Sequence, residues 1–399
     1  MINLRVDRIH YRDFISTRDL SKIIMHLYNI IISLFMCLTL GISNSHSNDN
    51  LPRTMVWSVY DIGASGYNEA SAIAEGIMKK YDIRVRLLPS GTSIGRLLAL
   101  KRKRVSVSFL GTEAYFASEG LYDFSAKKWG PQDLRLIIGR PNTFGIAVPA
   151  DAGINNIADL KDKRVAYVTA NPSLNVKVLG IMAFANLTFS DVEKVIYPGF
   201  GPTIKALQNG RLDAAGAVPT GSAVYELAAS NKGIKWLDMP EDNIDGWKKL
   251  NKLVPFMKPQ KEILGAGLDE NNPAHIGGYN YPNLTVYAET SENEVYNFMK
   301  AIDESFSFYK DISAVMFKWK LELSSGTPAE IPIHKGAIKY LKEKNLWNEE
   351  DEKWNNARLK RLAILIGTWK NFLTNNDHLD GEEFKKEWLK VRELALANN

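Results

Sequence analysis

The sequence predicts an α/β protein with two lobes of similar build and a helical C-terminal tail. Short apolar segments of strand length alternate with amphipathic helical segments in two successive series, the pattern of βαβ units around a mainly parallel sheet. The length of 399 residues exceeds what one compact core usually holds and suits two domains. From Glu292 onward the pattern is helical, with charged amphipathic stretches at Asp351–Leu373 and Glu382–Ala397.

The expected strands fall into two series. The first contains Met55–Tyr60, Val85–Leu88, Val105–Leu110 and Leu134–Gly139. The second contains Gly145–Pro149, Arg164–Val168, Val195–Tyr197, Ala214–Val218 and Ile234–Leu237, and is followed by Leu284–Ala288. We expect the chain to cross between the lobes near Arg140–Phe144 and near Leu284–Ala288, and these two crossovers to form a hinge. Lobe I would then contain residues 52–142 and 288–399, and lobe II residues 143–287.

The first fifty residues have the pattern of an export signal. Ile30–Ile42 contains no charged side chain, Ser43–Ser47 after it is small and polar, and the basic residues before it are Arg5, Arg8, Arg12, Arg18 and Lys22. Such a flank, with an apolar core of about 7–15 residues, describes a secretory signal peptide, and the core is shorter than the ~20 residues of a membrane span. We expect cleavage near Ser43–Ser47, loss of residues 1–45 and a periplasmic protein. An uncleaved anchor, a lipoprotein lipidated at Cys37 and a translation start at Met25 stay open as alternatives.

The charge balance argues against a polyanionic partner. The chain has 50 Lys and Arg against 45 Asp and Glu, and removal of residues 1–45 takes away five basic and three acidic residues, which leaves a net charge of +3. A nearly neutral protein has little electrostatic attraction to nucleic acid. The basic cluster Lys101–Arg104 is expected to close a helix, where cations suit the helix dipole. Because the same cleavage removes Cys37, the one cysteine, no disulfide or thiol chemistry is expected.

Small loops rich in hydroxyl groups or glycine follow six of the expected strands. They are Gly63–Tyr67, Ser90–Ser93 and Gly111–Glu113 in the first series, and Thr169–Ser173, Gly199–Thr203 and Pro219–Ser222 in the second. In a parallel sheet such loops gather at the carboxyl edge, which is the usual ligand side. Helix N-terminal amides and hydroxyls there would hold an anionic or polar small molecule, although helix capping explains any single loop. Six loops together favour a ligand cleft between the lobes.

Catalytic motifs are sparse in this sequence. Gly91–Gly95 matches the G-x-S-x-G nucleophile elbow, with Ser93 as nucleophile and His334 as the least unsuitable base. The match comes after only two strands, too early for the sheet and oxyanion loop of that fold. No H-E-x-x-H, dinucleotide-binding or P-loop pattern occurs, and apart from His46 at the cut itself the only other histidines beyond the cut are His275 and His378. We therefore expect a binding protein with no catalytic residue, metal or cofactor, and keep a serine hydrolase as an alternative.

The order of several short motifs resembles a transport family. The motifs are Ile62–Tyr67, Leu88–Ser93, Val105–Thr112, Ile157–Val165, Ala206–Ala214, Pro219–Thr220 and Ile331–Lys344. Over roughly residues 55–347 the chain resembles the TAXI-type solute-binding proteins of tripartite ATP-independent periplasmic (TRAP) transporters. It departs from them at Thr169–Ser173, where a Gly-Ser-Gly-like loop is common, at Lys335, where proline is usual, and in the long tail of residues 348–399.

The resemblance implies a type II-like periplasmic-binding-protein fold that closes over a small organic acid or amino acid and delivers it to a membrane permease driven by an ion gradient. The implied contacts in lobe I are Gly63, Ala64, Ser65, Gly66, Tyr67, Ser90, Thr92, Ser93 and Thr112. Those in lobe II are Thr169, Asn171, Ser173, Phe200, Pro219 and Thr220.

Three further residues have roles that the pattern leaves open. Tyr279, like Tyr67 and Phe200, either stacks on the ligand or packs in the core. The resemblance makes His334 a structural residue. We expect Arg96 to lie at the surface, with assistance to the ligand as its alternative role. A binding protein of an ATP-driven importer with the same fold is the alternative function.

Overall fold

The computed structural model describes residues 51–398, so the predicted signal peptide and Cys37 lie outside the described residues. Lobe I begins with β1 (Thr54–Val59), α2 (Ser65–Tyr81), β2 (Arg84–Pro89), α3 (Ser93–Lys101), β3 (Val107–Leu110), α4 (Glu113–Glu119) and η1 (Tyr122–Ser125). Most strand and helix positions expected for this part of the chain are confirmed, including the basic cluster at the end of α3.

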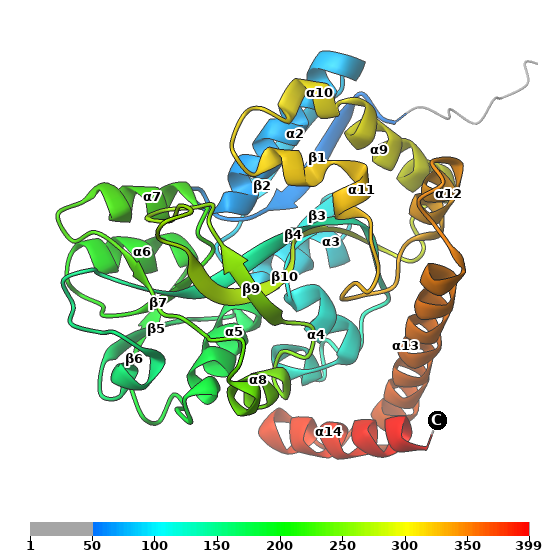
Figure 1. Cartoon of the computed structure of the whole chain (residues 1–399). Helices are drawn as coiled ribbons and strands as arrows, with labels where there is room; N and C mark the ends of the chain where they lie inside the picture. Colours follow the sequence, from blue (N-terminus) through cyan, green and yellow to red (C-terminus); the bar gives the residue numbers. More distant parts are fainter. Residues whose placement is uncertain (1–50, 399) are drawn as a thin grey trace, which may run out of the picture. The chain divides into compact units, whose positions relative to one another are not determined.

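Lobe II follows, and two long strands connect it to lobe I (Figure 1). Its elements are η2 (Ile157–Leu160), β5 (Arg164–Val168), α5 (Pro172–Phe184), β6 (Glu193–Tyr197), α6 (Phe200–Gln208), β7 (Ala215–Ala217), α7 (Ser222–Ala229), β8 (Lys235–Trp236), α8 (Ile244–Asn251) and β9 (Lys258–Glu262). The connecting strands are β4 (Leu134–Val148) and β10 (Ala274–Tyr287). The fold is thus an α/β fold of two lobes joined by two crossovers, as expected.

The central sheet corrects one expectation. Its strand order is β2-β1-β3-β10-β4-β7, with β8 paired to β4 and β9 paired to β10. β1 is parallel to β2 and β3, but β10 is antiparallel to β3, β4 and β9, and β4 is antiparallel to β7 and β8. The expectation of a mainly parallel sheet was therefore wrong. The reason is that the two expected strands on either side of Arg140–Phe144 are one strand, β4, which pairs antiparallel with β10 from Leu134 to Phe144.

The two long strands change partners where they pass between the lobes. Residues Ala274–Gly278 of β10 pair with β9 in lobe II, whereas Asn283–Thr285 pair with β3 in lobe I. The register against β4 shifts between Asn280 and Asn283. The change of partner in β10 therefore lies within residues 279–282, a few residues before the expected crossover at Leu284–Ala288. In β4 the pairing with β7 begins at Gly145, directly after the expected crossover at Arg140–Phe144.

The C-terminal part is helical, as expected. It comprises α9 (Glu292–Glu304), α10 (Phe306–Tyr309), η3 (Met316–Trp319), α11 (Leu321–Ser324), α12 (Lys335–Glu343), α13 (Glu349–Asn375) and α14 (Gly381–Ala397). The first five cover lobe I, and Trp319 of η3 packs in the buried core with Trp57 and Phe109 of the sheet. In residues 51–398 no helix is both long enough and apolar enough to cross a bilayer.

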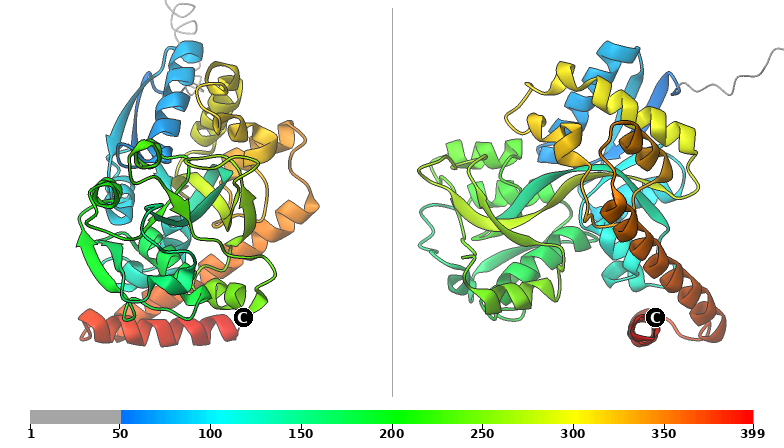
Figure 2. Two further views of the ribbon diagram at one scale, coloured as in Figure 1. Left: turned by 60° about the vertical axis from the view of Figure 1, so that its left-hand side comes forward. Right: turned by 45° about the vertical axis from the view of Figure 1, so that its right-hand side comes forward.

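The helices α13 and α14 form an arm at the edge of the molecule (Figure 2). Four aromatic side chains join the two helices in a small core of their own: Trp369, Phe372, Phe384 and Trp388. The arm is attached to the end of α4, because Arg361 and Arg392 both donate to the Glu119 carboxylate and the Trp388 indole donates to the Gly120 carbonyl at 2.7 Å.

Candidate functional site

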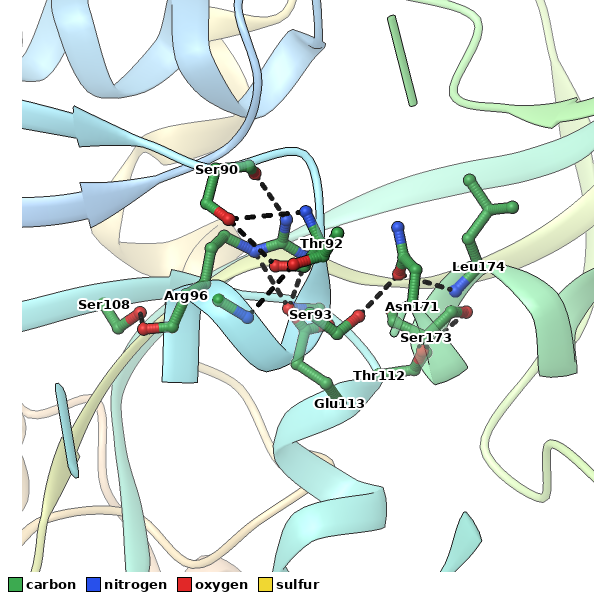
Figure 3. Close-up of polar contacts among 12 residues, drawn as sticks. Ser90, Thr92, Ser93, Arg96, Ser108, Thr112, Glu113, Asn171, Ser173 and Leu174 are labelled. Carbon is green, nitrogen blue, oxygen red and sulfur yellow. Dashed lines mark hydrogen bonds and ion pairs between the residues drawn. The ribbon is translucent and has the colours of Figure 1, made fainter. Parts of the chain in front are cut away.

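The predicted loops of the two lobes meet and touch. Three side-chain hydrogen bonds join them: Ser65 to Thr220 at 2.7 Å, Ser93 to Asn171 at 2.5 Å and Thr112 to Ser173 at 2.7 Å. Figure 3 shows the second and third of these pairs side by side between α3, α4 and α5. The sequence prediction that these loops would lie together is therefore correct, and the lobes of this conformation are closed on one another.

Helix capping explains two of the loops but not the others. Thr92 accepts from the Gly95 N–H at 3.1 Å and caps α3, and Asn171 accepts from the Leu174 N–H at 3.3 Å and caps α5. In contrast, α6 and α7 begin at the glycines 199 and 221, which have no capping side chain. Acceptor groups from lobe I bind the free N–H groups at these helix starts instead. The Asp61 carboxylate accepts from the N–H of residue 201 at 3.3 Å, and the carbonyl of residue 63 accepts from the N–H of residue 223 at 3.1 Å.

Closure leaves a small cavity between the loops. Its free volume is about 50 Å³. Six of the predicted contact residues line it: Ala64, Ser65, Asn171, Ser173, Phe200 and Tyr279. The rest of the predicted set lies outside its wall: Gly63, Gly66, Tyr67, Ser90, Thr92, Ser93, Thr112, Thr169, Pro219 and Thr220.

Several residues outside the wall have structural reasons for their type. Gly66 lies in the first turn of α2 beside two rings of the cavity wall, and a Cβ there would lie 2.5 Å from the Tyr60 ring and 2.9 Å from the Tyr281 hydroxyl. Tyr67 packs against the main core. Thr169 is exposed on its loop. These positions therefore shape the cavity or its rim without facing it.

Lys177 is the residue that the sequence analysis missed. It lies in α5, is 3% exposed and lines the cavity. Its ammonium donates to the Tyr279 hydroxyl at 3.0 Å and lies 4.2 Å and 4.3 Å from the ring centroids of Phe144 and Tyr279. Within residues 51–398 no carboxylate lies within ion-pair distance of it, and burial lowers its pKa from 10.5 to about 7. The signal was present in the sequence, because Lys177 is the one charged side chain of a helix whose other residues are apolar except Ser173 and Asn175.

Arg96 is buried at the cavity, so the expected surface role was wrong. It is 1% exposed, and its guanidinium donates to Glu113 at 3.1 Å and 2.6 Å and to the Ser90 carbonyl at 3.0 Å. Its guanidinium also lies 3.8 Å from the centroid of the Tyr60 ring. Burial alone would raise the pKa of Glu113, but the Arg96 charge and these hydrogen bonds hold it below its usual value. The pair is therefore neutral overall and contributes a fixed wall.

The charges of the cavity favour a small anion. Arg96 and Glu113 compensate each other, and Asp61 is engaged at the N-terminus of α6 in the opposite lobe. The Lys177 ammonium contacts two rings and a phenol hydroxyl, and the charges of Glu113 and Glu330 act on it without forming an ion pair with it. A carboxylate beside it would supply the missing counter-charge, and the surrounding rings would pack on an apolar body.

The structure does not bring together the residues that a serine hydrolase would need. Ser93 donates to Asn171, and no histidine lines the cavity. His334 is the N-cap of α12, where its Nδ1 accepts from the Gly336 N–H at 3.1 Å and its Nε2 lies 3.1 Å from the Thr290 carbonyl. Both ring nitrogens are thus engaged in a helix cap, and His334 has a structural role. In the described part of the chain no group of three or more acidic, His or Cys side chains is placed to hold a metal ion.

The family of the protein follows from its sequence. The model of the NMT1-like family matches residues 63–344, which include all six loops of the cleft. The chain belongs to the NMT1-like family. In this NMT1-like protein the arm of α13 and α14 lies beyond the family match.

Three solved structures share part of the chain arrangement of this protein. The alkanesulfonate-binding protein SsuA from Xanthomonas axonopodis pv. citri, bound to MOPS, is 15% identical, with a TM-score of 0.42 over 73% of this chain and 84% of that one. The aliphatic sulphonate binding protein SsuA from Escherichia coli is 16% identical, with a TM-score of 0.41 over 83% and 89%. A structure described as a periplasmic transporter is 15% identical, with a TM-score of 0.49 over 78% and 98%.

Proposed function

We propose that this NMT1-like protein is an extracytoplasmic receptor that holds a small carboxylate, an organic acid or an amino acid, between its lobes. The observation that carries the proposal is Lys177, a buried ammonium that forms no ion pair with the described residues and lies in a cavity between two lobes. Burying a charge without an ion-pair partner is energetically costly. A ligand that places a carboxylate beside Lys177 therefore gains more binding free energy than it would in a neutral cavity. The protein is proposed to bind its ligand without catalysing a reaction.

The cross-lobe contacts support a closing mechanism. Hydroxyl pairs such as Ser65–Thr220, together with the Asp61 contact to α6, exist only when the lobes are together. A ligand that touches both lobes would favour the closed state by its differential contact. We propose lobe boundaries at residues 52–142 with 288–399 and at residues 143–287, with the hinge at Arg140–Phe144 of β4 and at residues 279–282 of β10.

The partner and compartment belong to the same proposal. The motif order of residues 55–347 supports a TRAP-type permease as the acceptor of the ligand, and the apolar segment Ile30–Ile42 supports export to the periplasm through a cleaved signal peptide. A gene for a large fused permease beside this gene, with no ATPase gene, would support this transporter class over an ATP-driven importer. Uptake by proteoliposomes that carry that permease, measured with and without this protein and with a sodium gradient, tests the delivery step.

The binding step is tested with the exported chain, residues 46–399. We expect at least one compound of a panel of organic acids and amino acids to raise the melting temperature of the wild-type protein and to leave Lys177→Met unchanged. X-ray scattering should show a smaller radius of gyration when that compound is added. A panel without any effect on the wild-type protein, or an equal effect on Lys177→Met, would contradict the proposal.

A further inference from the structure

A second and larger crevice lies beside the hinge strands, on the side of the arm. Its free volume is about 400 Å³, against about 50 Å³ for the cavity between the loops. Lobe I contributes α4 and the segment before α12, lobe II contributes the segment between α8 and β9, and β4 and β10 form its floor. The arm supplies Trp354 and Arg358 from α13, which lies beyond the family match. This crevice is therefore partly built by a segment that the family match does not include.

Two buried donors without hydrogen-bond partners border the crevice. Asn142 of β4 is 4% exposed, and its Nδ2 has no partner. The Nε of Arg358 is also buried without a partner, while its NH2 donates to the Glu330 carbonyl at 2.9 Å. Buried donors in folded proteins almost always have an acceptor. Both residues line the same crevice, although the two nitrogens are themselves enclosed, so a small rotation of each side chain brings its donor to a ligand with acceptor oxygens.

The charges of the crevice favour an anion. Arg358 and the exposed Lys258 are its two cationic side chains. The carboxylate of Glu330, which is buried in the crevice, already accepts hydrogen bonds from the floor. Its donors are the Asn280 backbone N–H at 3.1 Å and the Asn283 side chain at 3.3 Å. Arg358 also faces Glu119, but at 3.6 Å and with two other arginines closer to that carboxylate. A carboxylate entering the crevice would therefore meet donors and positive charge.

The walls of the crevice favour a flat apolar body. Aromatic side chains stand on both sides, with Tyr115 and Trp354 from lobe I and Phe256 from lobe II. Tyr115 and Phe256 contact each other edge to face across the lobes, with centroids 5.1 Å apart. Aromatic rings prefer stacked or edge-on contact with other rings. A ring system of two fused rings fits a volume of about 400 Å³ but not one of about 50 Å³.

We propose that this crevice is a second ligand site, for aromatic carboxylates, separate from the cavity between the loops. The carboxylate binds Arg358 and the Asn142 amide, and the rings lie between Trp354 and Phe256. Because the walls come from both lobes, a ligand that fits the crevice of this closed conformation favours closure. Tyr279 borders both sites and accepts the hydrogen bond from Lys177, so the two sites share a side chain. The proposal does not depend on the identity of the ligand between the loops.

The test uses 2-naphthoate and residues 46–399. We expect saturable binding by the wild-type protein, followed by the change in naphthoate fluorescence. Arg358→Gln should weaken it at least about tenfold, as expected for loss of a charged hydrogen bond. Ala329→Trp, which fills the crevice from a partly buried position, should abolish it. Arg211→Gln removes an equal charge from an exposed position and should bind as the wild type does.

A variant of the first cavity separates the two sites. Lys177→Met should keep the affinity for 2-naphthoate, because that ligand is too large for the cavity between the loops. Circular dichroism and melting temperatures confirm that each variant is folded. The proposal is overturned if the wild-type protein does not bind 2-naphthoate at millimolar concentration, if the folded Ala329→Trp variant binds it normally, or if Lys177→Met is the variant that loses it.

Discussion

Replacing Lys177 with methionine should stabilise the ligand-free protein while it removes ligand binding. The buried ammonium has a pKa of about 7 instead of 10.5, and burial is the main cause. At about 1.36 kcal/mol for each pH unit, this difference corresponds to about 5 kcal/mol between the charged and neutral forms. Methionine has a similar length and packs well against rings such as Phe144 and Tyr279. We expect a gain of about 2–5 kcal/mol in the free energy of unfolding at pH 6, since the variant also loses the contacts of the ammonium with those rings.

The sign of the pH dependence follows from proton binding. Between pH 7 and 10.5 the unfolded chain keeps the proton on Lys177 and the folded chain does not, so the stability of the wild-type protein rises with pH in this window. Below pH 7 both states carry the proton and the full cost of burying the charge is present. The advantage of the methionine variant should therefore be greatest below pH 7 and largely lost by pH 10.5.

Urea unfolding followed by tryptophan fluorescence at pH 6, 8 and 10 measures this difference. Lys353→Met on the exposed face of α13 is the matched control, and its stability relative to the wild type should not change over the same range. A Lys177→Met protein that is less stable than the wild type at pH 6 would refute the reasoning. A stability difference that stays constant from pH 6 to 10 would refute it equally.

Three further changes test other parts of the structure. Asp61→Ala removes the acceptor that lobe I provides at the start of α6, which destabilises the closed state by about 1 kcal/mol. X-ray scattering should therefore show a larger radius of gyration for the variant. An unchanged radius would argue that this contact does not stabilise the closed state. Glu119→Gln leaves the arginines of the arm without their buried counter-charge, at a cost of about 3 kcal/mol. Trypsin should then cleave the arm after Lys370 or Lys385, the basic residues on either side of the turn between α13 and α14. Resistance equal to that of the wild type would contradict the anchoring role of Glu119. Burial lowers the pKa of His334 from 6.5 to about 4, so the free energy of unfolding of the wild-type protein should fall as the pH drops from 6.5 to 4. His334→Asn keeps a capping side chain, and urea titrations should show a smaller fall in its free energy of unfolding over this range. An identical pH profile of the variant would exclude His334 as the source of the fall.

The loops of the cleft could be predicted because their signal is local. Each combines a strand end, a glycine or hydroxyl residue and a helix start, and these features follow from neighbouring residues alone. The sequence therefore predicted that Ser93 and Asn171 would lie at one cleft, although they are far apart in the chain. It did not predict that such side chains would bind each other, because the degree of closure depends on the packing of whole lobes.

The charged groups of the cavity were harder to predict, because their environment is created by segments distant in sequence. Arg96 lies in a helix next to a polar loop, and an arginine at such a position is usually exposed. It is buried because Glu113 pairs with its guanidinium and the Tyr60 ring packs against it. Lys177 depends on rings from β4 and β10. The antiparallel pairing of those strands was missed for a related reason. The polar segment Arg140–Asn142 is typical of a strand end. Only the pairing with β10 makes the strand continue through this segment.

The short helix α4 connects the arm to the cavity. Its first residue, Glu113, holds Arg96 in the cavity wall, and its last residue, Glu119, holds the arginines of the arm. Seven residues of helix span about 10 Å, and a helix of this length moves as a rigid body. A shift of the arm would therefore move Glu113 and, with it, the salt bridge that forms one wall of the cavity. The arm is thus placed to influence the geometry of the cavity between the loops from outside it, although the family match ends before α13 begins.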